Sequence, residues 1–258
     1  MSNPRLSAQQ RRQDILQRTT AEGPSTVDDL AARYDVTPST IRRDLTRLGE
    51  AGLLARTYGG VIAVNGHGES SLPERAGEAQ GEKRAIAKLA AERITAGATL
   101  ILDAGSTIAA MTPHLRHREE LTVVTPNLQV INDLSDENSP VQVIAVAGRL
   151  RKLSRSFVGA LAEATLERVR GDIAFLGADS VSSDGQLCEM ETEQTRLKEI
   201  IGRRVTQVYV LAHGAKLGKA IGQASLSMPP SWTVVTDESA QPEHIEQLRA
   251  LGHEVIVA

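Results

Sequence analysis

The segment TPSTIRRDLTRL, residues 37–48, combines arginines and short hydroxyl side chains at helical spacing. Pro38 suits the first position of a helix, and Ile41, Leu45 and Leu48 form an apolar stripe that predicts one buried face. Polar side chains on the other faces could bind phosphates and base edges of duplex DNA, as a recognition helix does. An arginine-rich face that is merely solvated is the alternative. The candidate DNA-binding residues are Ser39, Thr40, Arg42, Arg43 and Arg47.

Two further helical patterns precede this segment and would position it. They cover residues 5–21 and 27–34, and Thr26 is suited to cap the second helix. We therefore count Thr26 among the residues expected at the DNA surface. Three short helices in this order, with a tight turn before the arginine-rich one, indicate a helix-turn-helix.

A hairpin pattern follows the third helix. Residues 52–60 read GLLARTYGG, in which the glycines mark turns and the intervening residues suit a pair of strands. Arg56 and Tyr58 would then lie on a wing and contact the sugar-phosphate backbone beside the groove. Residues 1–62 are thus expected to form a winged helix-turn-helix domain.

The rest of the chain alternates between strand and helix patterns. Seven short runs rich in Val, Ile and Leu are continuously apolar, which predicts strands buried on both faces. Helical patterns between most of them predict an α/β domain with a mostly parallel, Rossmann-like sheet over residues 83–258. The expected strands are residues 98–102, 121–125, 141–146, 173–176, 208–211, 232–235 and 254–257.

Small and polar residues follow these strands, at the edge where ligands of parallel sheets bind. DAGST, residues 103–107, places a glycine turn and two hydroxyls at a helix start, which suits a phosphate. A plain helix cap is the alternative for those hydroxyls. Several such ends converging on one rim favour a ligand site. The expected ligand-binding residues are Asp103, Gly105, Ser106, Thr107, Thr125, Asn127, Gly148, Arg149, Asp179 and Lys216.

Composition excludes several other classes of protein. The hydrophobic share of 41%, the charged share of 24% and the net charge of −3 are those of a globular chain rather than a histone-like packer. Aromatic residues at 2% argue against stacking platforms for single-stranded nucleic acid. A single cysteine, Cys188, allows no internal disulfide and no cysteine-based metal cluster. With no apolar run of about 18 residues and no leader pattern, we expect a cytoplasmic protein without a metal or cofactor.

Residues 63–82 are rich in glycine and polar side chains, which predicts an interdomain linker. The charge changes sign across it. Residues 1–62 hold 9 Arg against 7 Asp and Glu, or +2, which leaves 20 basic and 25 acidic residues, or −5, in the remainder. This asymmetry has the sign expected of a nucleic-acid module joined to an acidic body.

The motifs also carry a family resemblance. VDDLAARYDVTPSTIRRDLTRLGEAGLLARTYGGV resembles the N-terminal signature of DeoR-type bacterial transcriptional regulators, and the similarity extends over nearly the whole chain. The resemblance implies binding to operator DNA as a repressor of a sugar-metabolism operon. It also implies a second domain similar in fold to ribose-5-phosphate isomerase and CoA transferases, in which Glu193 joins the residues that sense a phosphorylated sugar. A homodimer or homotetramer is expected, because one module reads too few base pairs.

The chain departs from the family pattern at several positions of the second domain. His213-Gly214-Ala215-Lys216 stands where the family has Asp-His-Ser-Lys, and Leu197 stands where a lysine is usual, with Lys198 one place on. These changes leave the effector unidentified. One alternative is a regulator of a non-phosphorylated ligand, or of none. Another is a sugar-phosphate isomerase-like enzyme with an appended DNA module, in which Asp103, Asp179, Glu193 and Lys216 would do the chemistry.

Overall fold

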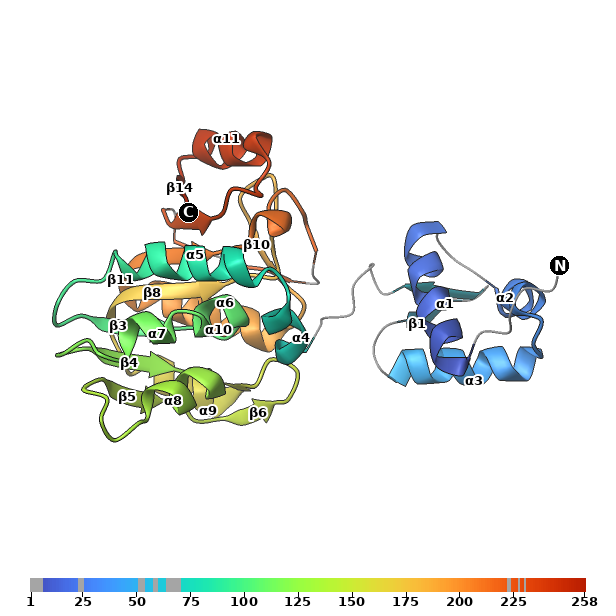
Figure 1. Cartoon of the computed structure of the whole chain (residues 1–258), viewed down its shortest axis with the longest axis horizontal. Helices are drawn as coiled ribbons and strands as arrows, with labels where there is room; N and C mark the ends of the chain where they lie inside the picture. The colour runs from blue at the N-terminus through green and yellow to red at the C-terminus, as the bar shows by residue number, and fades with distance from the viewer. Residues whose placement is uncertain are drawn as a thin grey trace. The chain divides into compact units, whose positions relative to one another are not determined.

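The chain forms two compact units, Met1–Ser70 and Ser71–Ala258 (Figure 1). No helix among the residues described is long and apolar enough to cross a membrane. The computed structural model describes residues 7–22, 26–50, 54–57, 60–63, 71–221, 224–226, 228–229 and 231–258.

The first unit has three helices followed by an antiparallel hairpin, as the sequence predicts. Its core lies where the helical stripes meet, with Ile15 from the first helix, Leu30 from the second and Ile41 from the third all buried. Left-handed Asp35, with φ of 49°, ends the second helix and makes the tight turn into the third. The elements are α1 (Ala8–Glu22), α2 (Val27–Tyr34), α3 (Pro38–Glu50), β1 (Leu54–Thr57) and β2 (Gly60–Ala63).

The second unit is built on a parallel sheet of seven strands, and the seven runs predicted from the sequence all belong to it. The order across the sheet is β14-β13-β11-β8-β3-β4-β5, so β3, the first of these strands along the chain, lies in the interior of the sheet. The strands are β3 (Thr99–Leu102), β4 (Thr122–Thr125), β5 (Gln142–Ala145), β8 (Gly171–Gly177), β11 (Val205–Leu211), β13 (Thr233–Thr236) and β14 (Glu254–Val257).

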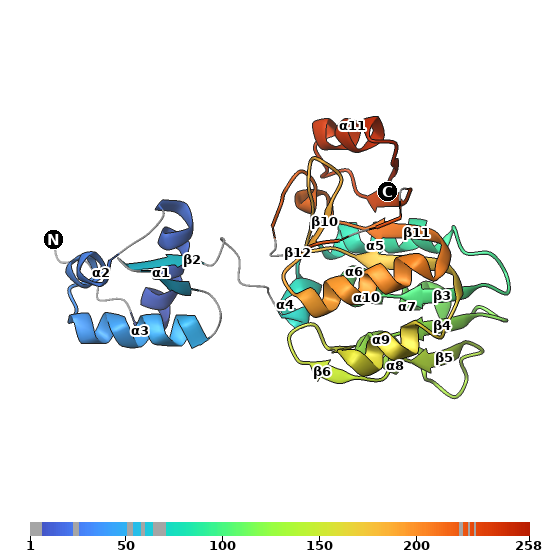
Figure 2. The same cartoon turned by 180° about the vertical axis from the view of Figure 1, so that it is seen from behind.

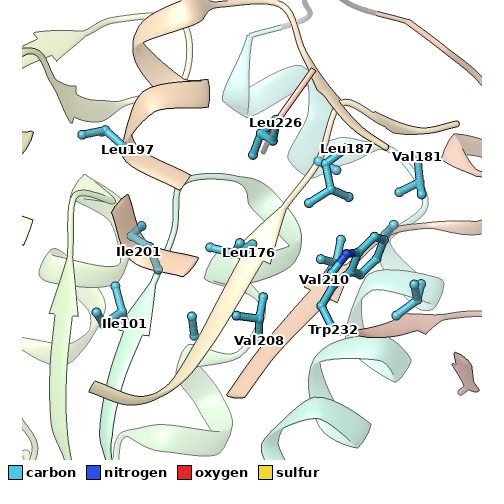
Figure 3. Packing of buried hydrophobic residues seen from close by; sticks show 14 of the residues in the cluster. Ile101, Leu176, Val181, Leu187, Leu197, Ile201, Val208, Val210, Leu226 and Trp232 are labelled. Carbon is cyan, nitrogen blue, oxygen red and sulfur yellow. The ribbon is translucent and has the colours of Figure 1, made fainter. Parts of the chain in front are cut away.

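Helices cover both faces of this sheet, which is why its strands are apolar throughout. Figure 1 shows α5, α6 and α7 in front of the sheet, and Figure 2 shows α9 and α10 in front of the opposite face. The buried cluster on the face covered by α9 and α10 includes Leu176, Ile201 and Trp232 (Figure 3). The helices are α4 (Leu72–Gly77), α5 (Gln80–Ala91), α6 (Ser106–Ala109), α7 (Thr112–Leu115), α8 (Leu128–Leu134), α9 (Ala160–Leu166), α10 (Thr192–Arg203) and α11 (Pro242–Ala250).

Two features of the second unit differ from the sequence-based expectation. Residues 71–82, assigned above to a linker, are part of this unit: Leu72 is buried and its N–H donates to the carbonyl of Leu153 at 2.8 Å. Residues 64–70 lie outside the described residues. The chain also forms small antiparallel pairings beside the main sheet, which are too short to show a sequence period. They involve β6 (Arg149–Arg151), β7 (Ser156–Val158), β9 (Ser180–Val181), β10 (Leu187–Glu189) and β12 (Ala224–Ser225).

Candidate functional site

A buried ion pair anchors the arginine-rich helix α3 to α1. Asp44 follows Ile41 by three residues and therefore lies on the inward side of α3. Its Oδ2 accepts a hydrogen bond from Nε of Arg11 at 2.7 Å, and its Oδ1 lies 3.3 Å from a guanidinium nitrogen of Arg12. Asp44 is 4% exposed and Arg11 8%. The carboxylate within the RRDL run thus holds the helix in place, a role that the sequence reasoning did not assign.

The expected DNA-contacting arginines lie on the outside of the same helix. Arg42, Arg43 and Arg47 are exposed, and none of them makes a hydrogen bond or ion pair through its side chain to a described residue. Ser39 is also exposed, but its hydroxyl lies 2.7 Å from Oγ1 of Thr37, which also contacts the Thr40 hydroxyl at 2.9 Å. Three cations are therefore available to phosphates, while the two hydroxyls are engaged in the helix cap.

The structure describes the remaining expected DNA-contacting residues, Thr26, Arg56 and Tyr58, only in part. Thr26 is exposed and caps α2: its Oγ1 accepts from the N–H of Asp29 at 3.1 Å and donates to the carboxylate of Asp29 at 2.6 Å. Arg56 belongs to β1, but its side chain, like the whole of Tyr58, lies outside the described residues.

Asp103 and Lys198 form the centre of the second unit's polar cluster. Asp103 follows β3 and is 3% exposed. Its Oδ2 accepts hydrogen bonds from Nζ of Lys198 and from the N–H of Gly177, the latter at 3.1 Å. Lys198 also donates to the carbonyl of Gly177 at 2.9 Å. The departure from the family pattern at Leu197 stands: Leu197 is buried in the core, and Lys198, one place on, is the lysine that contacts Asp103.

The side chain of Glu189 completes this cluster from β10. Its Oε1 lies 3.3 Å from Nζ of Lys198, and both side chains are 2% exposed. Burial raises the pKa of Glu189 to about 8, and the charges of Asp179 and Asp103 act in the same direction against the opposing charge of Lys198. Burial would lower the pKa of Lys198, but Asp103 and Glu189 outweigh it and raise that pKa above its usual range. The lysine stays charged between two acids.

A second group of cations lies around Asp179. Nζ of Lys216 donates to the carbonyl of Ala178 at 2.5 Å, and a guanidinium nitrogen of Arg75 lies 3.7 Å from Oδ1 of Asp179. Lys83, from α5, is 7% exposed and donates to the backbone carbonyls of Arg75 and of Glu78, the latter at 2.9 Å. Burial and, to a smaller extent, the charge of Lys216 lower the pKa of Lys83 to about 8. Burial likewise lowers the pKa of Lys216.

The loops after β3 and β4 support one another. Thr125 donates to the carbonyl of Leu102 at 2.6 Å, and Nδ2 of Asn127 donates to the carbonyls of Asp103 at 3.3 Å and Gly105 at 3.2 Å. Gly105 has a φ of 117°, which L side chains rarely adopt. Thr125 and Asn127 are buried, so they position the loop. Two other expected residues begin helix α6 directly after that loop, the partly exposed Ser106 and the buried Thr107.

The other expected ligand residues form a separate pair. Arg149 contacts the carboxylate of Glu193, and their side chains are 63% and 37% exposed. Within the described residues, no hydrogen bond or ion pair joins either of them to Asp103, Lys198 or Lys216. Gly148 lies in a close approach, because a Cβ there would come within 2.7 Å of the Val158 carbonyl. The structure therefore does not bring these three residues into the buried cluster.

The structure also accounts for one departure from the family pattern. A Cβ on Gly214 would lie 2.3 Å from the backbone nitrogen of Ala240, so this position has no room for a larger residue. The N–H of Gly214 donates to the carboxylate of Asp237 at 2.8 Å. His213 lies beside this contact, with Nε2 3.3 Å from the hydroxyl of Ser239.

A groove of about 660 Å³ opens between α5, α6, α7 and α8, beside the start of α6. Its volume is in the range of small-molecule sites. Of the expected ligand residues, Ser106 lines it and Asp103 and Lys216 do not. Lys83 lies both in this groove and near Lys216, and so connects the groove to the cation group. The other basic residues that line it are Arg84, Lys88, His114 and Arg116.

Sequence reasoning missed four of the charged residues that the structure gathers here, and only one left a usable signal. Gln194, Lys198 and Ile201 recur at helical spacing and are all buried, so the period of α10 places Lys198 on its inner face. Glu189 lies in a three-residue strand without such a period. Arg75 and Lys83 lie around the segment that composition assigned to a linker.

Both units match known families of protein domains. Residues 11–66 match the DeoR-like helix-turn-helix domain, and residues 78–238 match the DeoR C terminal sensor domain. The chain is 31% identical over 224 residues to the glycerol-3-phosphate regulon repressor of Escherichia coli (strain K12), covering 85% of this chain and 87% of that protein. It is 29% identical over 251 residues to the putative aga operon transcriptional repressor of Escherichia coli O157:H7, covering 96% and 93%.

Among solved structures, a D-ribose-5-phosphate isomerase in complex with phospho-erythronic acid is 19% identical, covers 53% of each chain and has a TM-score of 0.40. The sensor-domain match alone spans more than half of the sequence, and the regulators above align with most of its length. On these grounds the chain belongs to the DeoR family of transcriptional regulators.

Proposed function

We propose that this DeoR-family regulator represses a carbohydrate-metabolism operon and that a phosphorylated sugar bound in the second unit changes its affinity for operator DNA. The observation that carries the first part is the arrangement of α3. Its arginines Arg42, Arg43 and Arg47 face solvent, while Asp44 anchors the opposite side of the helix to Arg11. A helix held in this way can enter the major groove without losing its position on the domain.

The cation group supports the second part of the proposal. Lys83, Lys216 and Arg75 are near one another, and Asp179 is the carboxylate paired with Arg75. The charge of Lys198 is already paired with that of Asp103, and its Nζ also contacts Glu189. The burial that lowers the pKa of Lys83 and Lys216 makes a bound dianion favourable, since it would offset their mutual repulsion. One of the relatives is the repressor of the glycerol-3-phosphate regulon, and a small phosphorylated compound of this kind fits the proposed effector class.

The effector acts by binding one arrangement of the protein more tightly than another, because only a difference in affinity can shift an equilibrium. The charged groups of the site come from two parts of the chain: Asp103 follows strand β3, whereas Arg75 and Lys83 belong to α4 and α5, which precede that strand. A ligand bound there would therefore contact both parts. We propose that Asp103, Thr125 and Asn127 hold the loop in shape and that Ser106, Thr107, Lys83 and Lys216 contact the phosphate.

The test is fluorescence anisotropy with labelled DNA from upstream of the protein's own gene, with and without a panel of sugar phosphates and the corresponding free sugars. We expect tight binding that one phosphorylated sugar alters and its free sugar does not. Arg42→Ala/Arg43→Ala should abolish DNA binding, whereas Arg93→Ala, an exposed arginine of the second unit, should not. Lys216→Gln should bind DNA normally and respond weakly.

Other results would redirect the assignment. A response to the free sugar as strong as to its phosphate would identify a regulator of a non-phosphorylated ligand. Absence of any sequence preference, together with interconversion of sugar-phosphate isomers by the purified protein, would favour the enzyme that the sequence left as an alternative.

A further inference from the structure

Strand β5 forms one edge of the seven-stranded sheet and has only β4 beside it. The N–H of Gln142 donates to Leu121 and that of Val146 to Thr125, both at 2.9 Å. Backbone groups alternate in direction along a strand, so those of Val143 and Ala145 point away from β4. This edge therefore presents a row of backbone donors and acceptors that a further strand could pair with.

The edge lacks the features that usually prevent pairing. Residues 141–147 read VQVIAVA, without a charge or a proline, whereas natural edge strands commonly carry lysine, proline or an inward-pointing charge. The opposite edge, β14, includes the exposed Glu254. Pairing through β14 would bring this charged side chain into the interface, and pairing through β5 would not.

Apolar side chains are exposed around β5. Ile144 is 37% exposed, Leu150 on β6 41% and Leu161 on α9 67%. Ile144 points to the same face of the sheet as Val146, which packs with Ala162 of α9. Both Figure 1 and Figure 2 show β5, β6 and α9 on the same side of the second unit. The exposed apolar surface and the unpaired strand edge thus lie together.

We propose that β5 pairs antiparallel with β5 of a second copy of this chain, around a two-fold axis at Ile144. In this register Val143 of one copy exchanges hydrogen bonds with Ala145 of the other. Ile144 then faces Ile144 of the second copy in a non-hydrogen-bonded pair, in which Cα atoms are about 4.5 Å apart and side chains are in contact. The two sheets become one continuous sheet, and the exposed isoleucine is buried against its own copy.

The charges flanking β5 fit this antiparallel arrangement. Exposed Asp136 and Glu137 precede the strand, and exposed Lys152 and Arg155 follow it. Antiparallel pairing places the start of one strand beside the end of the other, so the acidic flank of each copy lies toward the basic flank of its partner. A parallel arrangement would instead bring like charges together.

The inference goes beyond the proposed function and does not depend on it, because mass is measured without DNA. The first experiment is sedimentation equilibrium of the full chain. We expect a mass of two chains, or an even multiple of this, where one chain is 27.7 kDa. Ile144→Lys and Ile144→Glu each place two like charges about 5 Å apart at the axis, so each variant should lose one level of assembly, from two chains to one. The matched controls are Val257→Lys and Val257→Glu on β14, where Val257 is 40% exposed, and these should assemble as wild type does.

Mixing the two Ile144 variants provides the decisive result. Lysine opposite glutamate is an attractive pair, so an equimolar mixture should recover the assembly that each variant lacks alone. A wild-type chain that is monomeric, Ile144 variants that assemble normally, or a mixture that stays dissociated would each overturn the proposal. Loss of assembly in the Val257 variants instead would assign the interface to β14 and overturn it as well.

Cross-linking tests the register. In a Cys188→Ser background, Ile144→Cys should form a disulfide-linked dimer on mild oxidation, because Cα atoms about 4.5 Å apart are within the range of disulfides. Val257→Cys, in the same background, should not. A cross-link at position 257 but not at 144 would contradict the proposed axis, and so would the absence of both.

Discussion

Nε of Arg11 lies 2.7 Å from Oδ2 of Asp44, and this contact joins the first helix of the DNA-binding unit to the third. Asp44 stands directly between Arg43, which faces solvent, and Leu45, which is buried. Within three consecutive residues, α3 thus supplies a candidate DNA contact, an ionic anchor and a core residue. The placement of the arginines on the surface of this unit therefore depends on a buried carboxylate.

Replacing Asp44 with Ala should destabilise the first unit. The change leaves Arg11 buried without its partner, a loss of about 3 kcal/mol in the free energy of unfolding. Urea unfolding followed by circular dichroism should show the transition of the first unit shifted to a lower urea concentration. Asp28→Ala, at an exposed position of α2, should cost less than about 1 kcal/mol. Equal effects of the two substitutions would show that the buried pair contributes little.

Replacing Arg42 with Ala should reduce the salt dependence of operator binding. Removing one cation that binds a phosphate lowers the slope of log K against log salt by about 0.9, because one fewer counterion is released. Anisotropy titrations at several salt concentrations measure this slope. Arg93→Ala should leave it unchanged. A slope that does not move in the Arg42 variant would mean that this arginine binds no phosphate, and equal weakening on specific and random DNA would argue against a base contact.

Replacing Glu189 with Gln should change how stability depends on pH. The pKa of Glu189 in the folded chain is about 8, above the ordinary 4.5, because the side chain is buried. Its contribution to stability is therefore fully present below about pH 4.5 and is lost as the pH rises to about 8. Wild type should become less stable relative to Glu189→Gln across this window. Urea unfolding at pH 5, 6.5 and 8 measures the difference, and a difference that stays constant would contradict the assigned burial effect.

Replacing Lys83 with Gln should weaken binding of a phosphorylated effector and reduce its pH dependence. Burial holds the pKa of Lys83 at about 8, and an adjacent phosphate would raise it by favouring the charged form. Wild-type affinity should therefore fall as the pH rises from 7 to 9. Calorimetric titration of the sugar phosphate selected by the panel measures both quantities. Lys152→Gln is the control, an exposed lysine of the second unit that does not line the groove. A flat wild-type profile would exclude Lys83 from the phosphate site.

Much of the structure of α3 could be predicted from its sequence pattern. The stripe of Ile41, Leu45 and Leu48 predicts which side of α3 is buried, and the exposure of Arg42 and Arg43 follows from it. Asp44 could not be assigned in the same way, because an acid on a buried stripe needs a partner and the pattern of α3 does not name one. Arg11 supplies it from a position 33 residues earlier.

The residues of the candidate ligand site were likewise predicted only in part. Asp103, Asp179 and Lys216 were expected at the strand ends and do belong to the polar clusters. Arg149 was expected there too, and the family resemblance added Glu193, but these two residues pair with each other in an exposed position. Strand ends specify which edge of the sheet a residue reaches, and the loop geometry beyond the strand then decides whether its side chain turns into the cluster.

Local patterns in the sequence predict most of the elements: three helices and a hairpin, then seven apolar strands with helices between them. Hydrophobic period and helix caps act over a few residues, so they can be read within each segment. Which charged residues are buried together depends instead on contacts between segments that are far apart in the sequence. Lys198 meets Asp103 across 95 positions of sequence, and Glu189 reaches the same lysine from a short strand. A buried charge needs an opposite charge nearby in space, and the strand order β11-β8-β3, which no local pattern contains, provides that proximity.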